Sequence, residues 1–180
     1  MRSILITGGT GGLGSAVVPR LQRDYDCILL KRDVVVPPAS YHALVMLAGG
    51  FAMGHEWESM LEANVMSAAR AIDAALPHLA DGGRIVAISS AASLTYPAGL
   101  AAYTASKSAL NAIIKTLAND LVSRKITANA LLPTALDTPA MRGAMPRDQL
   151  VPLERVAEWI AFLLSENGAG VTGQLITLAA

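Results

Sequence analysis

Short unbroken runs of apolar residues alternate along the chain with longer stretches in which apolar residues recur at helical spacing. The runs predict strands buried on both faces, at residues 3–7, 27–30, 43–48, 84–89, 126–132 and 173–178. The periodic stretches predict helices at residues 13–23, 101–122 and 152–165, and one or two helices at residues 56–79. Because strands and helices alternate, the expected fold is α/β, with a doubly wound parallel sheet of about six strands.

Prolines set two local limits on this pattern. Pro19 falls inside the first helix, where it removes a backbone hydrogen bond and is tolerated only near the helix start. Between Asp33 and Ala43 only nine residues remain, including Pro37 and Pro38, and they have no helical spacing. A parallel crossover that contains a helix needs about a dozen residues or more. This connection is therefore expected to lack a helix and to leave the second strand at an edge of the sheet.

The composition limits the classes of protein to which the chain can belong. Its 180 residues fit one domain, residues 1–180, and 53% hydrophobic against 16% charged residues excludes a disordered chain. Fourteen basic and fourteen acidic residues give a net charge of zero, and only 4% of residues are aromatic. No attraction to nucleic acid or to an anionic membrane surface is expected, and no base-stacking surface.

Signals for membrane insertion, disulfides and metals are missing from the sequence. The longest apolar stretch, residues 43–54, is too short and too rich in glycine to cross a membrane, and no signal peptide is expected. The single cysteine, Cys27, is expected to be a small buried residue in a reducing cytosol, so the predicted location is cytoplasmic. His42, His55 and His78 share no metal-ligand spacing and are interpreted as surface or capping residues, without a metal site.

A glycine-rich loop directly follows the first predicted strand. It matches G-x-G-x-x-G at Gly9, Gly11 and Gly14, and T-G-x-x-x-G-x-G from Thr7 onward. Bare backbone can approach a pyrophosphate, and the next helix directs free N–H groups at it. The residues expected to contact such a dinucleotide are Gly8, Thr10, Gly11, Gly12, Leu13 and Gly14. The alternative, a turn chosen for tight packing, does not require five glycines in seven positions.

The end of the second strand is expected to meet the adenosine ribose. The candidates are Lys31, Arg32 and Asp33; a cation suits the 2′-phosphate of NADP, whereas an acid suits the free 2′-hydroxyl of NAD. Arg32 lies 24 positions after Gly8, a spacing compatible with ribose contact, so NADP is favoured and NAD is the alternative. All three residues could instead be solvated turn residues.

Tyr103 and Lys107 are four residues apart near the start of the long predicted helix, so their side chains share one face. A free phenol has a pKa of about 10, and a neighbouring cation lowers it toward the range useful in acid–base catalysis. Ser90 ends the fourth strand, at the sheet edge where ligands bind. Its hydroxyl could hold a substrate carbonyl beside Tyr103, although Ser90 could also merely end the strand.

The chain resembles the short-chain dehydrogenase/reductase family over its whole length, because it carries a set of the family's motifs in the family's order. They are the glycine motif from Thr7 to Gly14, Ala48-Gly49, Asn64, Ser90, Tyr103-x-x-x-Lys107, and Pro133 with Thr138. The resemblance implies a Rossmann-type fold and hydride transfer between NADP or NAD and a small carbonyl or quinonoid substrate. Family members are usually longer, and the short connection before Ala43 implies that the usual third strand and its preceding helix are missing. The adenine site should therefore be shallow.

The resemblance also implies roles for individual residues. Tyr103 would be the acid–base, and Lys107 would lower the pKa of Tyr103 and hold the nicotinamide ribose. Ser90 would orient the substrate, and Asn64 would hold a proton-relay water. Without the resemblance, Asn64 would be interpreted as a core amide with its hydrogen bonds satisfied. Thr138 would meet the carboxamide of the cofactor. The remaining cofactor-binding residues implied by the family are Ala48, Gly49, Gly50 and Pro133.

Two segments, residues 47–54 and 132–146, resemble dihydropteridine reductase and its relatives within the family. That subgroup reduces quinonoid dihydropterin with NADH. The chain departs from it in having Ser90, where dihydropteridine reductase has no serine, and a basic pair before Asp33, where that enzyme has an acid suited to NADH. Pterin is thus one candidate substrate, and the resemblance does not single it out.

Two further expectations follow from the family. Its members commonly pair through the helix at residues 101–122, so a homodimer or homotetramer is expected. Small residues line the second side of this helix, at Ala102, Ala105, Ser106, Ala109 and Ala112. The alternative to an enzyme is a catalytically silent nucleotide-binding or sensor protein on the same scaffold. The intact set Asn64, Ser90, Tyr103 and Lys107 favours the enzyme. Ser93 and Thr95 receive no role.

Overall fold

Six strands form one sheet, in the order β2-β1-β3-β4-β5-β6. The structure, a computed structural model, describes residues 1–31 and 34–180. The strands are β1 (Arg2–Thr7), β2 (Tyr25–Leu30), β3 (Tyr41–Met46), β4 (Leu79–Ile88), β5 (Thr127–Pro133) and β6 (Leu175–Leu178). Every neighbouring pair is parallel, so the carboxyl ends of all six strands lie at one edge of the sheet.

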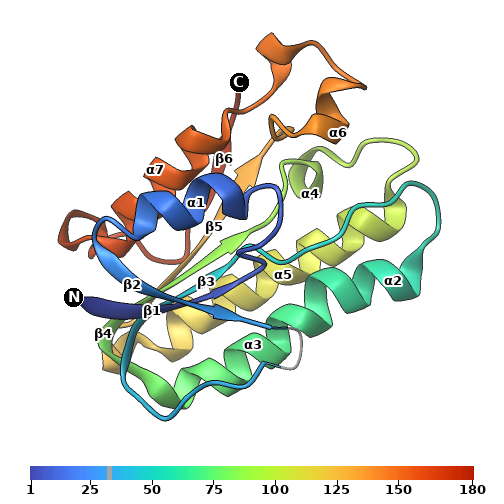
Figure 1. Cartoon of the computed structure of the whole chain (residues 1–180). Helices are drawn as coiled ribbons and strands as arrows, with labels where there is room; N and C mark the ends of the chain where they lie inside the picture. Colours follow the sequence, from blue (N-terminus) through green and yellow to red (C-terminus); the bar gives the residue numbers. More distant parts are fainter. Residues whose placement is uncertain (32–33) are drawn as a thin grey trace.

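Helices cover both faces of this sheet (Figure 1). One face carries α2 (Trp57–Leu61), the π-helical turn η1 (Glu62–Met66), α3 (Ser67–Ala75) and α5 (Ala101–Asp120). The opposite face carries α1 (Gly14–Leu21) and α7 (Leu153–Leu164), which pack against each other. Short turns complete the described chain: η2 (Leu76–His78), α4 (Ala92–Thr95), η3 (Val122–Arg124), α6 (Pro139–Arg142), η4 (Arg147–Gln149) and η5 (Glu166–Gly168). The doubly wound α/β fold is confirmed.

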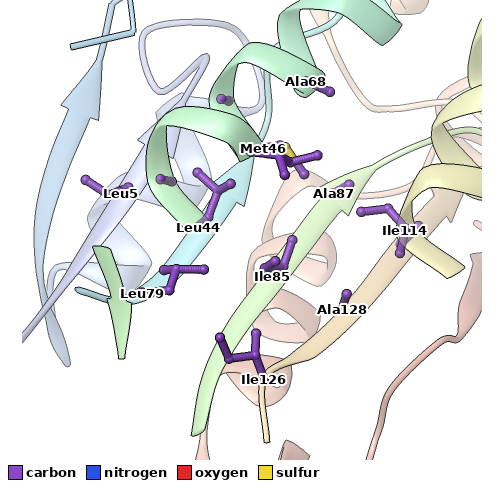
Figure 2. Close-up of a cluster of buried hydrophobic side chains, with 14 of the residues drawn as sticks. Leu5, Leu44, Met46, Ala68, Leu79, Ile85, Ala87, Ile114, Ile126 and Ala128 are labelled. Atoms are coloured by element: carbon purple, nitrogen blue, oxygen red, sulfur yellow. The ribbon is translucent and has the colours of Figure 1, made fainter. Parts of the chain in front are cut away.

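Alternating strand residues build a separate hydrophobic core on each face. Leu5 and Leu44 belong to the core under α3 and α5, which Figure 2 shows. Their neighbours Ile4 and Val45 belong to the core under α1 and α7. Since both faces are buried, successive residues of one strand must both be apolar, which explains the unbroken apolar runs of the sequence. The two cores hold the carboxyl ends of the strands in fixed relative positions.

The short β2–β3 connection has the predicted effect on the sheet. β3 pairs directly with β1, with Ile4 opposite Ala43, and β2 is an edge strand. Residues 34–40 contain neither helix nor strand. The Tyr41 hydroxyl donates to Pro37 O (2.9 Å), which fastens this connection to the start of β3. The expectation that a strand and its preceding helix are missing is confirmed.

Several predicted boundaries are wrong by a few residues. β3 begins at Tyr41 and ends at Met46, two residues before the predicted end. β4 begins at Leu79 rather than residue 84, because Leu79 pairs with Tyr41 across a register shift in the sheet. Residues 56–79, expected to hold one or two helices, contain α2 and α3 with the π turn between them, and Leu79 belongs to β4 instead. Pro19 lies beyond the first turn of α1, and the helix ends at Leu21, so its missing N–H affects only the last turn.

The interpretation of His42 as a surface residue is wrong, whereas the alternative of a capping residue fits, because its ring meets the carbonyl of Leu164, the last residue of α7. His42 is buried in β3, with Nε2 2.9 Å from Leu164 O and its ring stacked on Tyr25 at 5.7 Å. Burial lowers the pKa of this imidazole, which favours its neutral form. Cys27 is only half-buried, because β2 is an edge strand, and burial raises the pKa of its thiol.

The described residues contain neither a candidate membrane span nor a candidate metal site. In residues 1–31 and 34–180, no helix is long and apolar enough to cross a membrane. The same part of the chain has no group of three or more His, Cys, Asp or Glu side chains placed to hold a metal ion.

Candidate active site

The loops that follow β1, β3, β4 and β5 leave the sheet at its carboxyl edge (Figure 1). Gly8 has a φ of +69°, and a Cβ there would lie 2.4 Å from Ala48 N. Only glycine fits this position, so the loop after β1 lies directly on the loop after β3. A Cβ on Gly12 would lie 3.6 Å from Thr138 Cγ2, which brings the loop after β5 to the same place. The structure thus gathers three predicted cofactor-binding segments.

The glycine loop presents an uncapped helix N-terminus. The N-cap residue of α1, Leu13, makes no side-chain cap, and the first turn contains no acidic residue. Gly11 N donates to Gly8 O (3.0 Å), which closes the turn before the helix. Ser15 N donates to Gly11 O (3.2 Å) and Ala16 N donates to Leu13 O (3.2 Å), so the N–H groups left for an anion are those of Gly12, Leu13 and Gly14. The Leu13 side chain packs in the core beside Val17, so only its backbone can face a ligand.

Lys107 is a buried lysine on α5 without a carboxylate partner among the described residues. It is 4% exposed, and its Nζ donates to Ile88 O (3.0 Å). Burial disfavours the charged form and lowers the pKa of the ammonium to about 8. The Nζ lies 6.0 Å from the centroid of the Tyr103 ring, so both side chains face one space, as the four-residue spacing predicts.

The Tyr103 phenol has a raised pKa, which differs from the lowered pKa predicted from the sequence. Burial is the larger influence and raises the pKa, whereas a hydrogen bond with the Ser90 side chain lowers it. Ser90 Oγ also accepts from Ala92 N (3.2 Å), so the serine can direct its own proton toward the phenol oxygen. The Phe51 ring meets the Tyr103 ring edge-on, with centroids 5.0 Å apart, and remains exposed on its other side. Ser90 and Tyr103 therefore lie together at the end of β4.

Asn64 lies in the π turn η1 and is fully buried. Its Nδ2 donates to Gly50 O (3.0 Å) and Ser106 Oγ (3.0 Å), and its Oδ1 accepts from Gly50 N (2.9 Å). A Cβ on Gly49 would lie 2.8 Å from Asn64 Oδ1 and 3.1 Å from Lys107 Nζ. The Asn64 amide thus has the bonds of a satisfied core amide. It holds the loop after β3 beside Lys107.

The loop after β5 is closed by an ion-pair cluster. Pro133 is buried at the end of β5, and Thr138 Oγ1 accepts from Met141 N (3.4 Å) at the start of α6. The Asp137 carboxylate pairs with Arg142 (2.5 Å) and Arg147 (3.2 Å), and these partners lower its pKa. The cluster fixes α6 and η4 over the carboxyl edge, next to the glycine loop.

The predicted residues do not all meet in this site. Arg32 and its neighbour Asp33 lie outside the described residues, and Lys31 is exposed just after β2. Sequence reasoning assigned no role to Phe51, because its contact with Tyr103 depends on how the loop after β3 packs against α5. It also missed Asn111, although its position four residues after Lys107 could have indicated the shared helix face.

The small-residue side of α5 is only partly a free surface. Ala105 and Ala112 are exposed, whereas Ala102 and Ser106 are buried against the chain itself. Ser106 uses its hydroxyl to donate to Tyr103 O (2.7 Å) and to accept from Asn64. Two of the five small residues therefore pack against the chain itself, and pairing of two copies through this helix stays a prediction.

Comparison with known proteins places the chain among reductases. A family model, adh_short_C2, described as enoyl-(acyl carrier protein) reductase, matches residues 31–179. The cyclic-di-GMP-binding biofilm dispersal mediator protein of Escherichia coli (strain K12) is 29% identical over 228 residues, covering 98% of this chain and 95% of that protein. The 3-oxoacyl-[acyl-carrier-protein] reductase FabG of Pseudomonas aeruginosa (strain PAO1) is 32% identical, covering 67% of this chain and 54% of the enzyme.

A solved structure shows the same likeness at the level of the fold. A short chain dehydrogenase from Burkholderia cenocepacia J2315, in complex with NADP, superposes with a TM-score of 0.85. It is 28% identical and covers 98% of this chain and 96% of that chain. The chain therefore spans nearly the full length of this structure and of the first relative, but about half of the P. aeruginosa reductase.

Proposed function

Because the chain belongs to the short-chain dehydrogenase/reductase family, we propose that it is an oxidoreductase that uses NADP to reduce a small carbonyl or quinonoid compound. The observation that carries the proposal is the pairing on α5. A buried lysine, Lys107, faces the ring of Tyr103, and the Ser90 side chain lies close enough to the same phenol to lower its pKa. A buried ammonium without a carboxylate partner in the described chain destabilises the fold, and such groups concentrate at sites of chemistry.

The residues present fit a dinucleotide cofactor. The uncapped N-terminus of α1 and the glycine loop suit a pyrophosphate, through the backbone of Thr10, Gly11 and Gly12. A Cβ on Gly49 would lie 3.1 Å from Lys107 Nζ, so a side chain there would displace the lysine that is proposed to hold the nicotinamide ribose. The other proposed cofactor contacts are Gly8, Leu13, Gly14, Ala48, Gly50, Tyr103, Pro133 and Thr138. When bound, the cofactor supplies the hydride.

The side chains of the site divide the remaining work. When substrate is bound, Ser90 donates its proton to the substrate oxygen instead of the phenol and so polarises the carbonyl bond. Tyr103 transfers its phenolic proton to that oxygen as negative charge develops on it. Lys107 then stabilises the phenolate, because an ammonium nearby favours the charged form. Since burial raises the pKa of Tyr103, the phenol stays protonated at neutral pH and is ready to act as an acid.

Asn64 has a defined part in this proposal. Its amide already makes three hydrogen bonds to Gly50 and Ser106, so it holds the loop after β3 against Lys107. A proton-relay water at Asn64, which the family resemblance implies, stays a prediction.

The choice of NADP over NAD rests on the sequence and on a relative. Arg32 is proposed to contact the 2′-phosphate, and the B. cenocepacia structure contains NADP. A partly solvated contact of this kind should strengthen binding by about 1–2 kcal/mol, which is roughly tenfold in affinity. Titrating NADPH and NADH into the wild-type chain and Arg32→Ala tests this. Equal affinities in the wild type would refute the assignment to Arg32.

Replacement of Tyr103 tests the enzyme proposal directly. Tyr103→Phe should bind NADPH as the wild type does, measured by nucleotide fluorescence, yet lose turnover on a panel of ketones, 3-oxoacyl thioesters and quinonoid pterins. Near-normal turnover would refute the role of Tyr103. A homo-oligomer and a cytoplasmic location stay predictions.

A second candidate function is suggested by one relative. The E. coli protein is named for cyclic-di-GMP binding, and it matches nearly the whole chain. A nucleotide-binding sensor on this scaffold would bind cyclic di-GMP by calorimetry and show no turnover on the panel. Turnover that depends on Tyr103 would favour the enzyme instead.

A further inference from the structure

A buried chain of hydrogen bonds joins the turn that carries Ser90 to α5. In α4, Ser93 Oγ donates to Ser90 O (2.6 Å), and Ser93 N donates to the same oxygen (3.1 Å). On α5, Asn111 Nδ2 donates to Ser93 Oγ (2.8 Å). Ser93 is 1% exposed and Asn111 is 5% exposed, so bulk water does not compete for these bonds. The Ser90 carbonyl, the Ser93 hydroxyl and the Asn111 amide form one continuous link.

Asn111 lies on the same helix stripe as the proposed proton donor. Tyr103, Lys107 and Asn111 are spaced by four residues, so they share one face of α5. The Ser90 segment meets this stripe one turn earlier as well, because Ser89 Oγ donates to Lys107 O (3.3 Å). α4 packs against α5 at the carboxyl edge of the sheet (Figure 1). This face of α5 therefore carries the Tyr103 phenol and also contacts the turn that carries Ser90.

The Asn111 amide is present despite a cost in stability. Among the described residues its Oδ1 is buried with no hydrogen-bond partner. An orphaned buried oxygen destabilises a fold, whereas leucine would fill a similar volume beside Leu110 and Ile114 without that cost. A residue that weakens the core while bonding to an active-site turn points to a role in the site.

We propose that Ser93 and Asn111 are positioning residues that hold the Ser90 hydroxyl against the Tyr103 phenol. The catalytic consequence rests on the proposed function. Ser93 holds Ser90 O through two bonds, and Asn111 fixes Ser93 to the helix that carries Tyr103. Loss of either bond leaves only two longer bonds between this segment and α5, Ser89 Oγ to Lys107 O (3.3 Å) and Ser108 Oγ to Ser93 O (3.3 Å), so the Ser90 turn is held less firmly against the phenol. A displacement of about 1 Å can cost a large factor in rate.

The test compares Ser93→Ala and Asn111→Leu with a matched control, Thr95→Val. The Thr95 hydroxyl, also on α4, donates to the carbonyl of its N-cap residue, Ala91 O (3.2 Å), but makes no bond to α5. Asn111→Leu removes the orphaned oxygen, so it should fold at least as stably as the wild type.

The main readout is the Tyr103 phenolate titration, followed by ultraviolet absorbance, with the Tyr103→Phe signal subtracted. The Ser90 hydrogen bond lowers the phenol pKa, so a displaced Ser90 should raise the titration midpoint. The other titratable group facing the phenol is Lys107, from α5, and it is unchanged in every variant. Ser93→Ala and Asn111→Leu, the two variants that break the tether from Ser90 O through Ser93 to Asn111, should shift the midpoint upward by similar amounts. The Thr95→Val control should not shift it.

Two further results are expected from the same proteins. The double variant of Ser93 and Asn111 should shift no further than either single variant, because both break one link. The kcat should fall about tenfold, less than when a polarising donor is removed outright. NADPH affinity should stay at the wild-type value.

Several outcomes would overturn the tether: unchanged midpoints in both variants, fully additive shifts, or cofactor affinity that falls in parallel with kcat. If the wild-type chain is inactive on every substrate but the midpoints still shift, the proposed function fails while the tether stands. If the wild type is active and the midpoints do not move, the tether fails alone.

Discussion

Replacing Lys107 by methionine should stabilise the fold at neutral pH while removing activity. Burial lowers the pKa of Lys107 from an ordinary 10.5 to about 8. At about 1.4 kcal/mol per pKa unit, keeping this ammonium charged in the folded chain at pH 7 costs about 3 kcal/mol. Methionine removes that cost but leaves Ile88 O without its donor, at a loss of about 1–2 kcal/mol. The net expected gain is about 1–2 kcal/mol.

The difference in stability between the wild type and Lys107→Met should depend on pH and change sign. Above pH 8 the folded wild type releases the Lys107 proton, whereas the unfolded chain keeps it to about pH 10.5. The unfolded state therefore binds more protons over this window, so wild-type stability rises with pH. The methionine variant lacks this rise. Its advantage at pH 7 should shrink above pH 8 and reverse near pH 10, where only the lost hydrogen bond remains.

Urea unfolding at pH 7, 8.5 and 10 measures the difference between the two proteins. Lys115→Met, an exposed lysine on the same helix, is the matched control and should show no such reversal. A Lys107→Met variant that is destabilised at pH 7, or a difference that stays constant to pH 10, would show that burial does not perturb this lysine as described.

Three other predictions can be checked separately. Gly8→Ala should lose about 2 kcal/mol or more in urea unfolding, because its Cβ would lie 2.4 Å from a backbone nitrogen at a φ of +69°; Gly54→Ala, with a φ of +79° and open space, should lose less. Asp137→Asn should expose the loop after β5 to limited proteolysis at neutral pH, and the wild type should lose protection only as pH falls through the depressed pKa of Asp137, since a lowered carboxyl pKa stabilises above that value. Ala105→Arg should convert a homo-oligomer to monomers by light scattering, because Ala105 is exposed on α5; a wild-type monomer would contradict pairing through this helix.

The sequence predicted those parts of the protein that depend on neighbouring residues. Strands buried on both faces need apolar residues at every position, and helices need them at every third or fourth, so element order and sheet type could be read from spacing. The glycine loop was predictable because a tight turn before a helix has few solutions. The missing crossover helix followed from chain length alone. Boundaries such as Leu79 in β4 were wrong, because pairing with Tyr41 decides them.

Tertiary structure decided the properties that depend on contacts between distant residues. The spacing of Tyr103 and Lys107 predicted a shared face, but not that Lys107 would be buried with Ile88 O as its acceptor, or that burial would raise rather than lower the pKa of Tyr103. Asn64 could be placed on an apolar stripe, but its three bonds need the loop after β3 and Ser106. Desolvation and hydrogen bonding act through space and depend on every segment packed around a group, so local spacing does not encode them.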